Sequence, residues 1–331
     1  MILAGDVGGT NTRLAFFEQR AGKLQNLFEH IYPSHGHASL EDIVAEFLAS
    51  RKFRPDAVAI GVAGPVRDGV CRATNLPWVV DARLVAKRIG FPSITLLNDL
   101  EANAYGIATL APVDFALLQR GAPDARGNCV VVSPGTGLGE AALHWEGTRY
   151  SPLASEGGHS SFAPTDELQD EMLKYMRAKF GHVSWERLVC GPGLVNIYEF
   201  LRDTKRGEEP AWLAAEMKQG DPAPVISRLA LAEKSALCEK ALDLFVMLLG
   251  SEAGNMALKV LATGGVYIGG GIAPKILPKL QTPAFLAVFA DKGRMKEMLE
   301  SMPVRVILND GTALRGAALR AMMQQSEKQP A

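Results

Sequence analysis

Apolar residues at the start of the chain follow a period of two, which indicates β-strands. Leu14 and Phe16 alternate with Ala15 and Phe17, and another apolar run precedes them from residue 1 to residue 7. Gly8-Gly9 separates the two runs and predicts a turn between antiparallel strands. The standard glycine-rich phosphate loops are followed at once by a helix, so this hairpin differs from both.

The same pattern returns in the middle of the chain. Cys129–Ser133 has the apolar character of a strand, Gly135-Thr136-Gly137 has that of a turn, and a second strand follows to Leu143. A repeated strand, glycine turn and strand indicates an internal duplication. We therefore expect two similar α/β halves that face each other across a nucleotide cleft.

Further apolar runs predict the remaining elements. Strands are expected at Val58–Val62, Ile94–Leu97 and Val304–Leu308. Helices are expected at Asp99–Leu110, Asp166–Phe180, Gly193–Arg202, from about Pro224 to Leu249 and from about Thr312 to Met323. A strand from Val260 is expected to end at Gly269-Gly270-Gly271, where glycines let a flat ring lie close to the backbone, with a helix behind them. The end of the chain, from about Gln324, is expected to fray.

Length, charge and cysteine content narrow the class of protein. A chain of 331 residues exceeds the size at which one core usually keeps growing, so two domains with a cleft are expected. The 35 basic and 36 acidic residues give a formal charge of −1 without a long basic run, and a nucleic-acid partner is not expected. The cysteines are far apart and form no C-x-x-C pair, which indicates reduced thiols. They are Cys71, Cys129, Cys190 and Cys238.

No targeting or membrane segment is expected. Met1 leads directly into a strand without the basic and apolar regions of a signal peptide. The most apolar helical stretch, Ala241–Leu249, contains Asp243, is expected to stop at Gly250, and is too short to span a bilayer. These features predict a soluble, cytoplasmic protein.

Three glycine turns are candidates for nucleotide binding. Asp6-Val7-Gly8-Gly9-Thr10-Asn11 offers amides and a hydroxyl to phosphate oxygens, and its carboxylate could hold Mg²⁺ or the water around it. An ordinary Gly-Gly hairpin with Asp and Asn neighbours is the alternative. Gly135-Thr136-Gly137 and Gly269-Gly270-Gly271 also fit plain turns, but three such turns in a duplicated fold favour a nucleotide site.

Several polar residues suit the binding of a sugar. Asn98-Asp99 lies where a strand ends and a helix begins, so it could point into a cleft or simply cap the helix. Glu156 and His159 flank two glycines and could bind hydroxyls, or His159 could be a buried, satisfied histidine. Glu186 could join them, or could be a first-turn charge on a helix capped by Ser184.

Together these motifs carry a resemblance to a known family. The three glycine turns look like the nucleotide signatures of the actin, heat-shock-70 and sugar-kinase ATPase superfamily. The closer similarity is to bacterial hexokinase-type glucokinases, and it covers nearly the whole chain. It rests on LLNDLEANAYG at 96–106, SEGGHSSFAP at 155–164, WERLVCGPGLVNIY at 185–198 and FADKGRMKEMLESMPVRVILNDGTALRGAA at 289–318.

The resemblance implies an actin-like, ribonuclease H-like α/β fold with duplicated mixed-sheet halves. It also implies that Asp99 is the general base for the sugar 6-hydroxyl and that Asn98 holds the sugar. The other implied sugar ligands are Glu156, His159 and Glu186. The implied ATP-binding residues are Gly5, Asp6, Val7, Gly8, Gly9, Thr10, Asn11, Gly135, Thr136, Gly137, Gly269, Gly270 and Gly271, with Asp6 facing Mg²⁺ through water.

The resemblance also predicts domain boundaries and distinguishes this chain from a related family. A small domain is expected at residues 1–107 with about 310–325, a large domain at 108–309 and a frayed tail at 326–331. The related repressor, ORF and kinase family usually has a cysteine-rich zinc motif near its sugar-binding histidine. The sequence has no such cluster, so no structural zinc is expected. Asn75 and Gly64-Pro65 lie in loops that can border the sugar, without an assigned role.

The implied activity is ATP-dependent phosphorylation of D-glucose at O6, which yields glucose 6-phosphate and ADP and feeds glycolysis. A broad hexokinase or another hexose or amino-sugar kinase is the alternative, and ADP or polyphosphate could replace ATP. A sugar-responsive regulator would need a DNA-binding helix-turn-helix before the first strand. A chaperone or filament subunit would not need Asn98-Asp99 together with Glu156 and His159. A homodimer that closes on glucose, without a nucleic-acid or membrane partner, is expected.

Overall fold

The computed structural model describes residues 1–20, 22–50, 53–73 and 76–328. The chain forms two compact units, called unit 1 and unit 2 below. Unit 1 consists of Met1–Pro112, Tyr150–Ala154 and Asn309–Ala331, and unit 2 consists of Val113–Arg149 and Ser155–Leu308. The domain boundaries expected from the sequence stay a prediction, because compactness does not test whether either part folds alone.

Unit 1 is built on a five-stranded mixed sheet of order β3-β2-β1-β4-β8. The strands are β1 Ile2–Val7, β2 Asn11–Arg20, β3 Lys23–Pro33, β4 Ala57–Val62 and β8 Thr95–Asn98. Strand β1 pairs antiparallel with β2 and parallel with β4, and β4 pairs parallel with β8. The predicted N-terminal hairpin is therefore confirmed.

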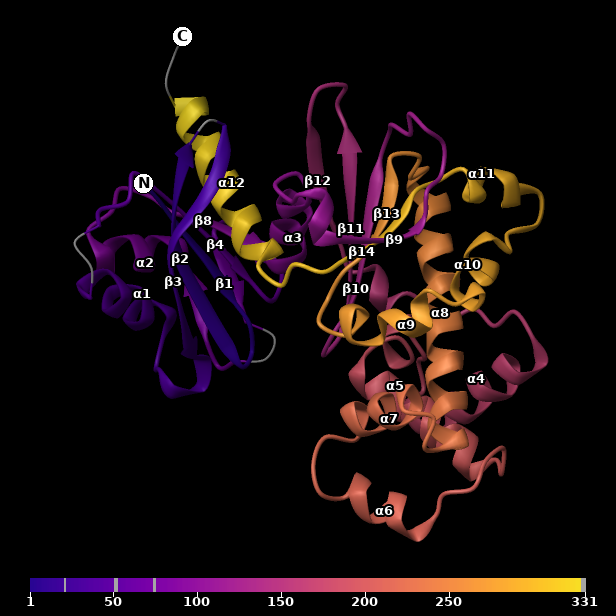
Figure 1. Ribbon diagram of the computed structural model, residues 1–331. Helices are drawn as coiled ribbons and strands as arrows, with labels where there is room; N and C mark the ends of the chain where they lie inside the picture. Colours follow the sequence, from indigo (N-terminus) through magenta and orange to yellow (C-terminus); the bar gives the residue numbers. More distant parts are fainter. Residues whose placement is uncertain (21, 51–52, 74–75, 329–331) are drawn as a thin grey trace. The chain divides into compact units, whose positions relative to one another are not determined.

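Successive side chains along the strands of unit 1 point to opposite faces of the sheet, and both faces are apolar. Phe16 stacks on Phe47 of α1, with ring centroids 5.2 Å apart, whereas its neighbour Phe17 belongs to the cluster on the opposite face. Helices α1 (Leu40–Ala49) and α2 (Ala82–Ile89) cover the first face, and α3 (Asp99–Ile107) and α12 (Thr312–Lys328) cover the second (Figure 1). A small antiparallel sheet and one short helix complete the unit. They are β5 Val66–Arg67, β6 Val70–Arg72, β7 Val79–Asp81 and η1 Ser34–Gly36.

A second sheet, of order β12-β11-β10-β13-β14-β9, repeats this topology. Its strands are β9 Phe115–Gln119, β10 Cys129–Pro134, β11 Leu138–Trp145, β12 Tyr150–Ser155, β13 Gly265–Ile268 and β14 Val304–Ile307. Strand β10 pairs antiparallel with β11 and parallel with β13, and β13 pairs parallel with β14. Strands β10, β11, β13 and β14 thus correspond to β1, β2, β4 and β8, which confirms the predicted duplicated α/β architecture.

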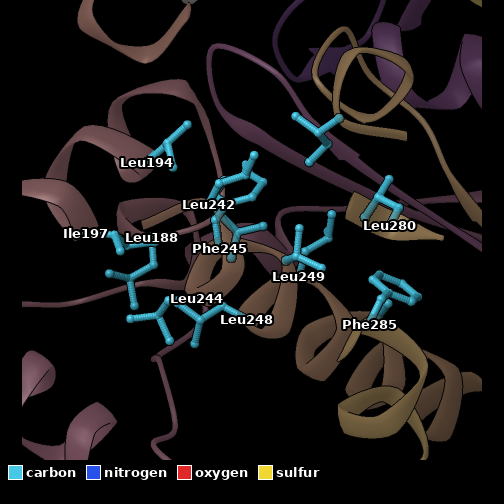
Figure 2. Close-up of a cluster of buried hydrophobic side chains, with 14 of the residues drawn as sticks. Leu188, Leu194, Ile197, Leu242, Leu244, Phe245, Leu248, Leu249, Leu280 and Phe285 are labelled. Carbon is cyan, nitrogen blue, oxygen red and sulfur yellow. The ribbon is translucent and has the colours of Figure 1, made fainter. Parts of the chain in front are cut away.

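The core of unit 2 surrounds the long helix α8 (Ala236–Val260). Figure 2 shows Leu242, Phe245 and Leu249 of this helix near Leu194 and Phe285 of neighbouring helices. Because α8 is enclosed by other helices and the sheet, most of its faces can be apolar. The remaining helices of the unit are α4 Glu167–Phe180, α5 Gly191–Asp203, α6 Ala211–Met217, α7 Pro222–Leu231, α9 Leu277–Leu280, α10 Pro283–Ala290 and α11 Lys296–Glu300. Besides η1, the short 3₁₀ helices are η2 Pro112–Asp114, η3 Gly157–His159, η4 Trp185–Arg187, η5 Ala273–Ile276 and η6 Gly293–Met295.

The expected end of a helix at Gly250 is wrong, because α8 continues ten residues further to Val260. A Cβ at Gly250 would lie 2.5 Å from the carbonyl oxygen of Phe285, and one at Gly254 would lie 2.5 Å from that of Phe289. The glycines therefore allow close packing of α10. Among the described residues, α8 alone has the length and apolarity of a membrane-crossing helix, yet 78% of its most apolar window is buried inside the protein.

Three further elements differ most from those expected, and α3 also ends earlier, at Ile107 rather than Leu110. The helical segment from Pro224 consists of α7 and α8, separated where Ser235 caps α8 by accepting from the amide of Cys238. Val260 ends α8 and Leu261 adopts a left-handed conformation, so the strand before the triple glycine covers only β13. Helix α12 extends past Gln324 to Lys328, and the expected fraying of the chain end stays a prediction. Side-chain packing of α12, including Ala317 and Ala321, holds the helix on the sheet.

Candidate active site

The β1–β2 turn of unit 1 has the form expected for the first glycine motif. The amide of Gly8 donates to the carbonyl oxygen of Asn11 over 2.9 Å, which closes the turn. Asp6 lies beside the turn, paired with Arg13 of β2 and with Gly61 of β4. Burial raises the pKa of Asp6 to about 6, although the positive charge of Arg13 opposes the shift. A carboxyl group is thus held at the end of the strand, next to the turn.

Ser34, the first residue of η1, forms hydrogen bonds with this turn. Its hydroxyl donates to the carbonyl oxygen of Gly8 and shares a hydrogen bond with the hydroxyl of Thr12, each over 2.9 Å. Its amide donates to the carbonyl oxygen of Thr10 over 2.8 Å. Ser34 and Thr12 are both completely buried. One serine therefore fixes three positions of the turn and of the strand that follows it.

Asn98 and Asp99 lie where β8 meets α3, as expected. The Asn98 side-chain oxygen accepts from the amides of Leu100 and Glu101, over 2.9 and 3.3 Å. Its side-chain nitrogen donates to the carbonyl oxygen of Gly64 over 3.0 Å. The capping alternative is therefore correct for Asn98, and this bond also ties the Gly64-Pro65 loop to the start of the helix.

Asp99 is the first residue of α3 and is half-buried. Its charge acts together with burial, the larger cause, to raise the pKa of the Cys71 thiol. Because Asn98 already caps the helix, Asp99 does not supply the capping bonds. Asn75 lies outside the described residues.

In unit 2, the β10–β11 turn is joined to Glu186. The amide of Gly135 donates to the carbonyl oxygen of Gly137 over 2.8 Å, and the Glu186 carboxylate accepts from the amide of Leu138 over 2.9 Å. A Cβ at Gly137 would overlap a carboxylate oxygen of Glu186. Ser184 makes no capping hydrogen bond with its side chain. Ser184 is nonetheless the N-cap residue of η4 and Glu186 lies in its first turn, so Glu186 occupies that position and is also bonded to the β10–β11 turn.

The structure brings together the three residues expected to bind sugar in unit 2. His159 Nε2 lies 3.9 Å from a carboxylate oxygen of Glu156, and His159 Nδ1 lies 3.8 Å from one of Glu186. A short antiparallel bridge between Ser161 and Ser184 holds η3 and η4 next to each other. The His159 side chain is 62% exposed, which rules out the buried and satisfied histidine. Two carboxylates and an imidazole thus form one polar cluster that a ligand can reach.

The triple glycine lies against the same turn. The amide of Gly269 donates to the carbonyl oxygen of Val132 over 2.9 Å, and the amide of Ile272 donates to that of Pro134 over 3.3 Å. Gly270 has a φ of 74°, and a Cβ there would overlap the carbonyl oxygen of Pro134. The backbone conformation therefore requires glycine at position 270.

A cavity of about 1120 Å³ opens beside these two glycine segments within unit 2. Gly135, Thr136 and Gly271 line one part of it, and Leu194 and Ile272 are among its apolar lining residues. A Cβ at Gly271 would have no atom within 4 Å, and one at Gly135 would meet its first atom at 4.0 Å. Neither glycine has a left-handed conformation. The protein itself therefore does not require glycine at these positions, whereas a ligand lying against the backbone would.

Comparison with known proteins identifies the family. The model of the Glucokinase family matches residues 3–324. A glucokinase of Nostoc sp. (strain PCC 7120) is 40% identical, over 97% of this chain and 98% of the relative. The chain belongs to the glucokinase family. The glucokinase of Saccharophagus degradans is 35% identical, over 96% of each chain.

Solved structures agree with membership of the glucokinase family. The crystal structure of a glucokinase from an Antarctic psychrotroph matches with a TM-score of 0.85 and 31% identity, over 97% of this chain and 98% of the other. A glucokinase from Balamuthia mandrillaris, solved in complex with glucose, matches with a TM-score of 0.80 and 22% identity, over 97% and 93%. At that identity the second match shows the shared fold alone.

The glucokinase resemblance pointed to the glycine turns and the polar cluster, but two buried residues escaped notice. Ser34 lies in a segment without a motif, and it reaches the β1–β2 turn only because β3 returns beside β2. Glu140 lies three residues after Gly137 of the second glycine turn and is only 1% exposed. A charged residue at an inward position of a strand was the one available signal.

Proposed function

We propose that the protein transfers the terminal phosphoryl group of ATP to O6 of D-glucose, which yields glucose 6-phosphate and ADP. Family membership supports the reaction class, and the cluster of Glu156, His159 and Glu186 is the observation that carries the proposal. A sugar presents several hydroxyl groups that each donate and accept. Carboxylates accept hydrogen bonds and an imidazole can do either, so this cluster suits that pattern of hydroxyl groups.

Asp99 would act as the general base of the reaction. Its carboxylate would accept the proton of the 6-hydroxyl as the oxygen attacks the terminal phosphorus, and would hold that hydroxyl in line beforehand. Asn98 would support this role mainly by fixing the start of α3, since its side chain is committed to Leu100, Glu101 and Gly64.

The glycine segments would bind the nucleotide. Gly135 and Gly271 leave room for a ligand against the backbone, and the apolar lining of the adjoining cavity suits an adenine ring. Asp6 would lie by the phosphates at the β1–β2 turn. Within the described parts of the chain, no group of three or more His, Cys, Asp or Glu side chains could hold a metal ion. Asp6 would face Mg²⁺ through water, and the ion would neutralise charge on the phosphates.

Gly270 and Gly271, two of the three glycines at 269–271, give a matched test of nucleotide binding. Gly271→Ala is expected to leave the melting temperature unchanged and to raise KM for MgATP about tenfold, or ~1.4 kcal/mol, because its methyl group would occupy ligand space. KM for glucose is expected to stay the same. Gly270→Ala is expected to lower the melting temperature instead, because of its φ of 74°. Unchanged MgATP kinetics in a folded Gly271→Ala protein would place the nucleotide elsewhere.

Ser34 gives a second test, on the β1–β2 turn. Ser34→Ala leaves the buried Thr12 hydroxyl and the Gly8 carbonyl oxygen without their partner, which costs about 1–3 kcal/mol. Because the turn would bind phosphates, KM for MgATP is expected to rise roughly tenfold while the Kd for glucose stays unchanged. Ser39→Ala is the control, since Ser39 caps α1 through Asp42. It is expected to lower stability by about 1 kcal/mol without changing KM, and equal kinetics in both variants would remove Ser34 from this role.

A substrate panel tests the proposed reaction itself. Initial rates would be measured with glucose, mannose, fructose and N-acetylglucosamine, each with ATP, ADP and polyphosphate as the phosphoryl donor. The proposal expects the highest kcat/KM with glucose and ATP, because a missing or inverted hydroxyl leaves a group of the cluster unpaired. Equal use of all the sugars would instead identify a broad hexokinase, and a preference for another donor would correct the assignment of ATP.

We also propose a cytoplasmic homodimer that needs no nucleic acid or membrane. The near-neutral formal charge of −1 supports the absence of a polyanionic partner. All four cysteines are free and buried, as expected for a reducing compartment. Light scattering coupled to size-exclusion chromatography would measure the mass directly, and a monomer at micromolar concentration would contradict the dimer.

A further inference from the structure

Two glutamates in the interior of unit 2 have no role in the reaction described above. Glu140 of β11 is 1% exposed and Glu252 of α8 is completely buried. Neither carboxyl oxygen of Glu140 has a hydrogen-bond partner among the described residues, and the same holds for Oε1 of Glu252. Oε2 of Glu252 accepts from the Asn255 side-chain amide over 2.8 Å, and Oε1 lies 3.5 Å from Lys259 Nζ.

Glu140 lies directly beneath the loop that carries two of the sugar ligands. A Cβ at Gly157 would overlap Oε2 of Glu140, so this carboxyl group contacts the Gly157 backbone. The next glycine, Gly158, rests in the same way on the carbonyl oxygen of Leu138. Strand β11 therefore supports η3, and with it the Glu156 and His159 side chains on either side of the two glycines.

The charged groups around Glu140 come from three parts of unit 2. From α8, Glu252 raises the pKa of Glu140 through its charge, and Lys259, whose Nζ lies 3.5 Å from Glu252, opposes that effect. Lys292 follows α10 and faces Glu252, and burial lowers the pKa of Lys292. The loop above contributes Glu156 and His159, which are both more than 60% exposed, at 68% and 62%.

Two neighbouring carboxylates in such a place would be costly, since most of their oxygens have no donor. A proton on Glu140 removes one of the two charges and provides a donor for Glu252. Burial, followed by the charge of Glu252, raises the pKa of Glu140 to about 8. Both effects favour the protonated form of Glu140.

We propose that Glu140 is a positioning residue of the sugar-binding loop, which it holds as a protonated carboxyl group that donates to Glu252 and supports the Gly157 backbone. Loss of the proton places a second negative charge under the loop. The carboxylate can then regain water only if η3 lifts, which displaces Glu156 and His159. The inference rests on the proposed binding of glucose by this loop.

The decisive measurement is the Kd for glucose between pH 7 and pH 9, by isothermal titration calorimetry, in wild type and Glu140→Gln. Glutamine keeps the shape and the donor but cannot ionise. If only the protonated form binds, a pKa of about 8 makes the wild-type Kd about tenfold higher at pH 9 than at pH 7. Glu140→Gln is expected to change by less than about twofold over the same range.

Two further variants separate this role from a general effect of removing charge. Glu233→Gln removes an exposed glutamate of unit 2 and is expected to behave like wild type. Glu252→Gln removes the neighbouring charge that raises the Glu140 pKa, so the rise in Kd is expected to begin at a lower pH. The Kd for MgATP is expected to be independent of pH across this range in all four proteins.

Stability provides a readout that does not depend on glucose. A carboxyl group whose pKa rises from 4.5 to about 8 on folding stabilises the protein fully below pH 4.5, and this contribution is lost as the pH rises toward 8. Glu140→Gln cannot ionise and therefore does not lose this stability. The difference between its melting temperature and that of wild type is expected to shift in favour of the variant as the pH rises from 5 to 9.

The outcomes distinguish the inference from the function on which it rests. Absence of glucose binding at pH 7 in wild type would reject the proposed function. Binding at pH 7 with the same pH dependence in wild type and Glu140→Gln would reject the role of Glu140 alone. A pH-dependent Kd in wild type that becomes flat in Glu140→Gln, with Glu233→Gln unchanged, would support it.

Discussion

Asp99→Asn is expected to lower kcat for glucose phosphorylation by about 10²–10⁴-fold, the range typical of a lost general base. Asparagine has nearly the same shape but cannot accept the proton of the 6-hydroxyl. The Kd for glucose is expected to change little, because the side chain can still form a hydrogen bond. Pre-steady-state and steady-state rates in a coupled assay would measure the loss, with the Kd determined separately by calorimetry.

The structure predicts that this variant stays folded. Asn98 supplies the capping bonds of α3, so Asp99→Asn keeps these bonds and weakens the favourable interaction of a charge with the helix N-terminus, about 0.3–1 kcal/mol. Glu101→Gln is the matched control, because it removes another acidic group from the same helical turn. It is expected to keep kcat within about threefold. If Asp99→Asn retained more than about a tenth of kcat, Asp99 would have no role as a base.

Local patterns were sufficient to predict the strands that frame the site. Alternation around Phe16 and the glycine turn defined the first hairpin, and its return at residues 129–143 predicted the duplication that the two strand orders share. Within each hairpin, the alternating residues and the glycine turn lie within a few residues of each other in the chain. Such patterns can be recognised in a single sequence because they depend on strand periodicity and turn geometry rather than on distant contacts.

The errors came from contacts that the local pattern does not contain. Gly250 resembles a helix end, yet it lies inside α8 because the backbone of α10 packs against it. Val260 belongs to an apolar run that suits a strand, but it completes the last turn of the same helix. In both cases tertiary packing outweighs intrinsic propensity, which is worth about 1 kcal/mol for glycine in a helix.

The candidate site shows the same division. Glu156 and His159 were found because they flank a glycine pair, and their 3.9 Å separation arises within that loop. Glu186 was found because of its family segment, but its 3.8 Å distance from His159 depends on the bridge between Ser161 and Ser184. Ser34 and Glu140 act through contacts made across the fold. No spacing in the sequence marks such residues, so only the arrangement of the strands could reveal them.

Helices α3 and α12 of unit 1 cross so closely that two glycines are required. A Cβ at Gly316 would overlap the carbonyl oxygen of Ala102 and lie 2.6 Å from the amide nitrogen of Gly106. A Cβ at Gly106 would overlap the carbonyl oxygen of Thr312. The neighbouring atoms belong to the backbone, so no side-chain rotation can relieve the overlap. The crossing matters for function because α3 begins at Asp99.

Gly316→Ala is therefore expected to destabilise the protein by at least the ~1–3 kcal/mol typical of overpacked cores, since the two helices must separate to admit the methyl group. Chemical denaturation monitored by circular dichroism would measure the loss, and the protein that remains folded is expected to have a lower kcat because the start of α3 shifts. Gly36→Ala is the control in the same unit, where a Cβ would meet its first atom, in Pro33, at an ordinary 3.5 Å. Gly36→Ala is expected to be neutral or to stabilise the protein by up to about 1 kcal/mol, because alanine lowers the conformational entropy of the unfolded chain. Equal stability of Gly316→Ala and Gly36→Ala would show that the helices do not cross at this distance, and would remove the physical reason for a fixed position of Asp99.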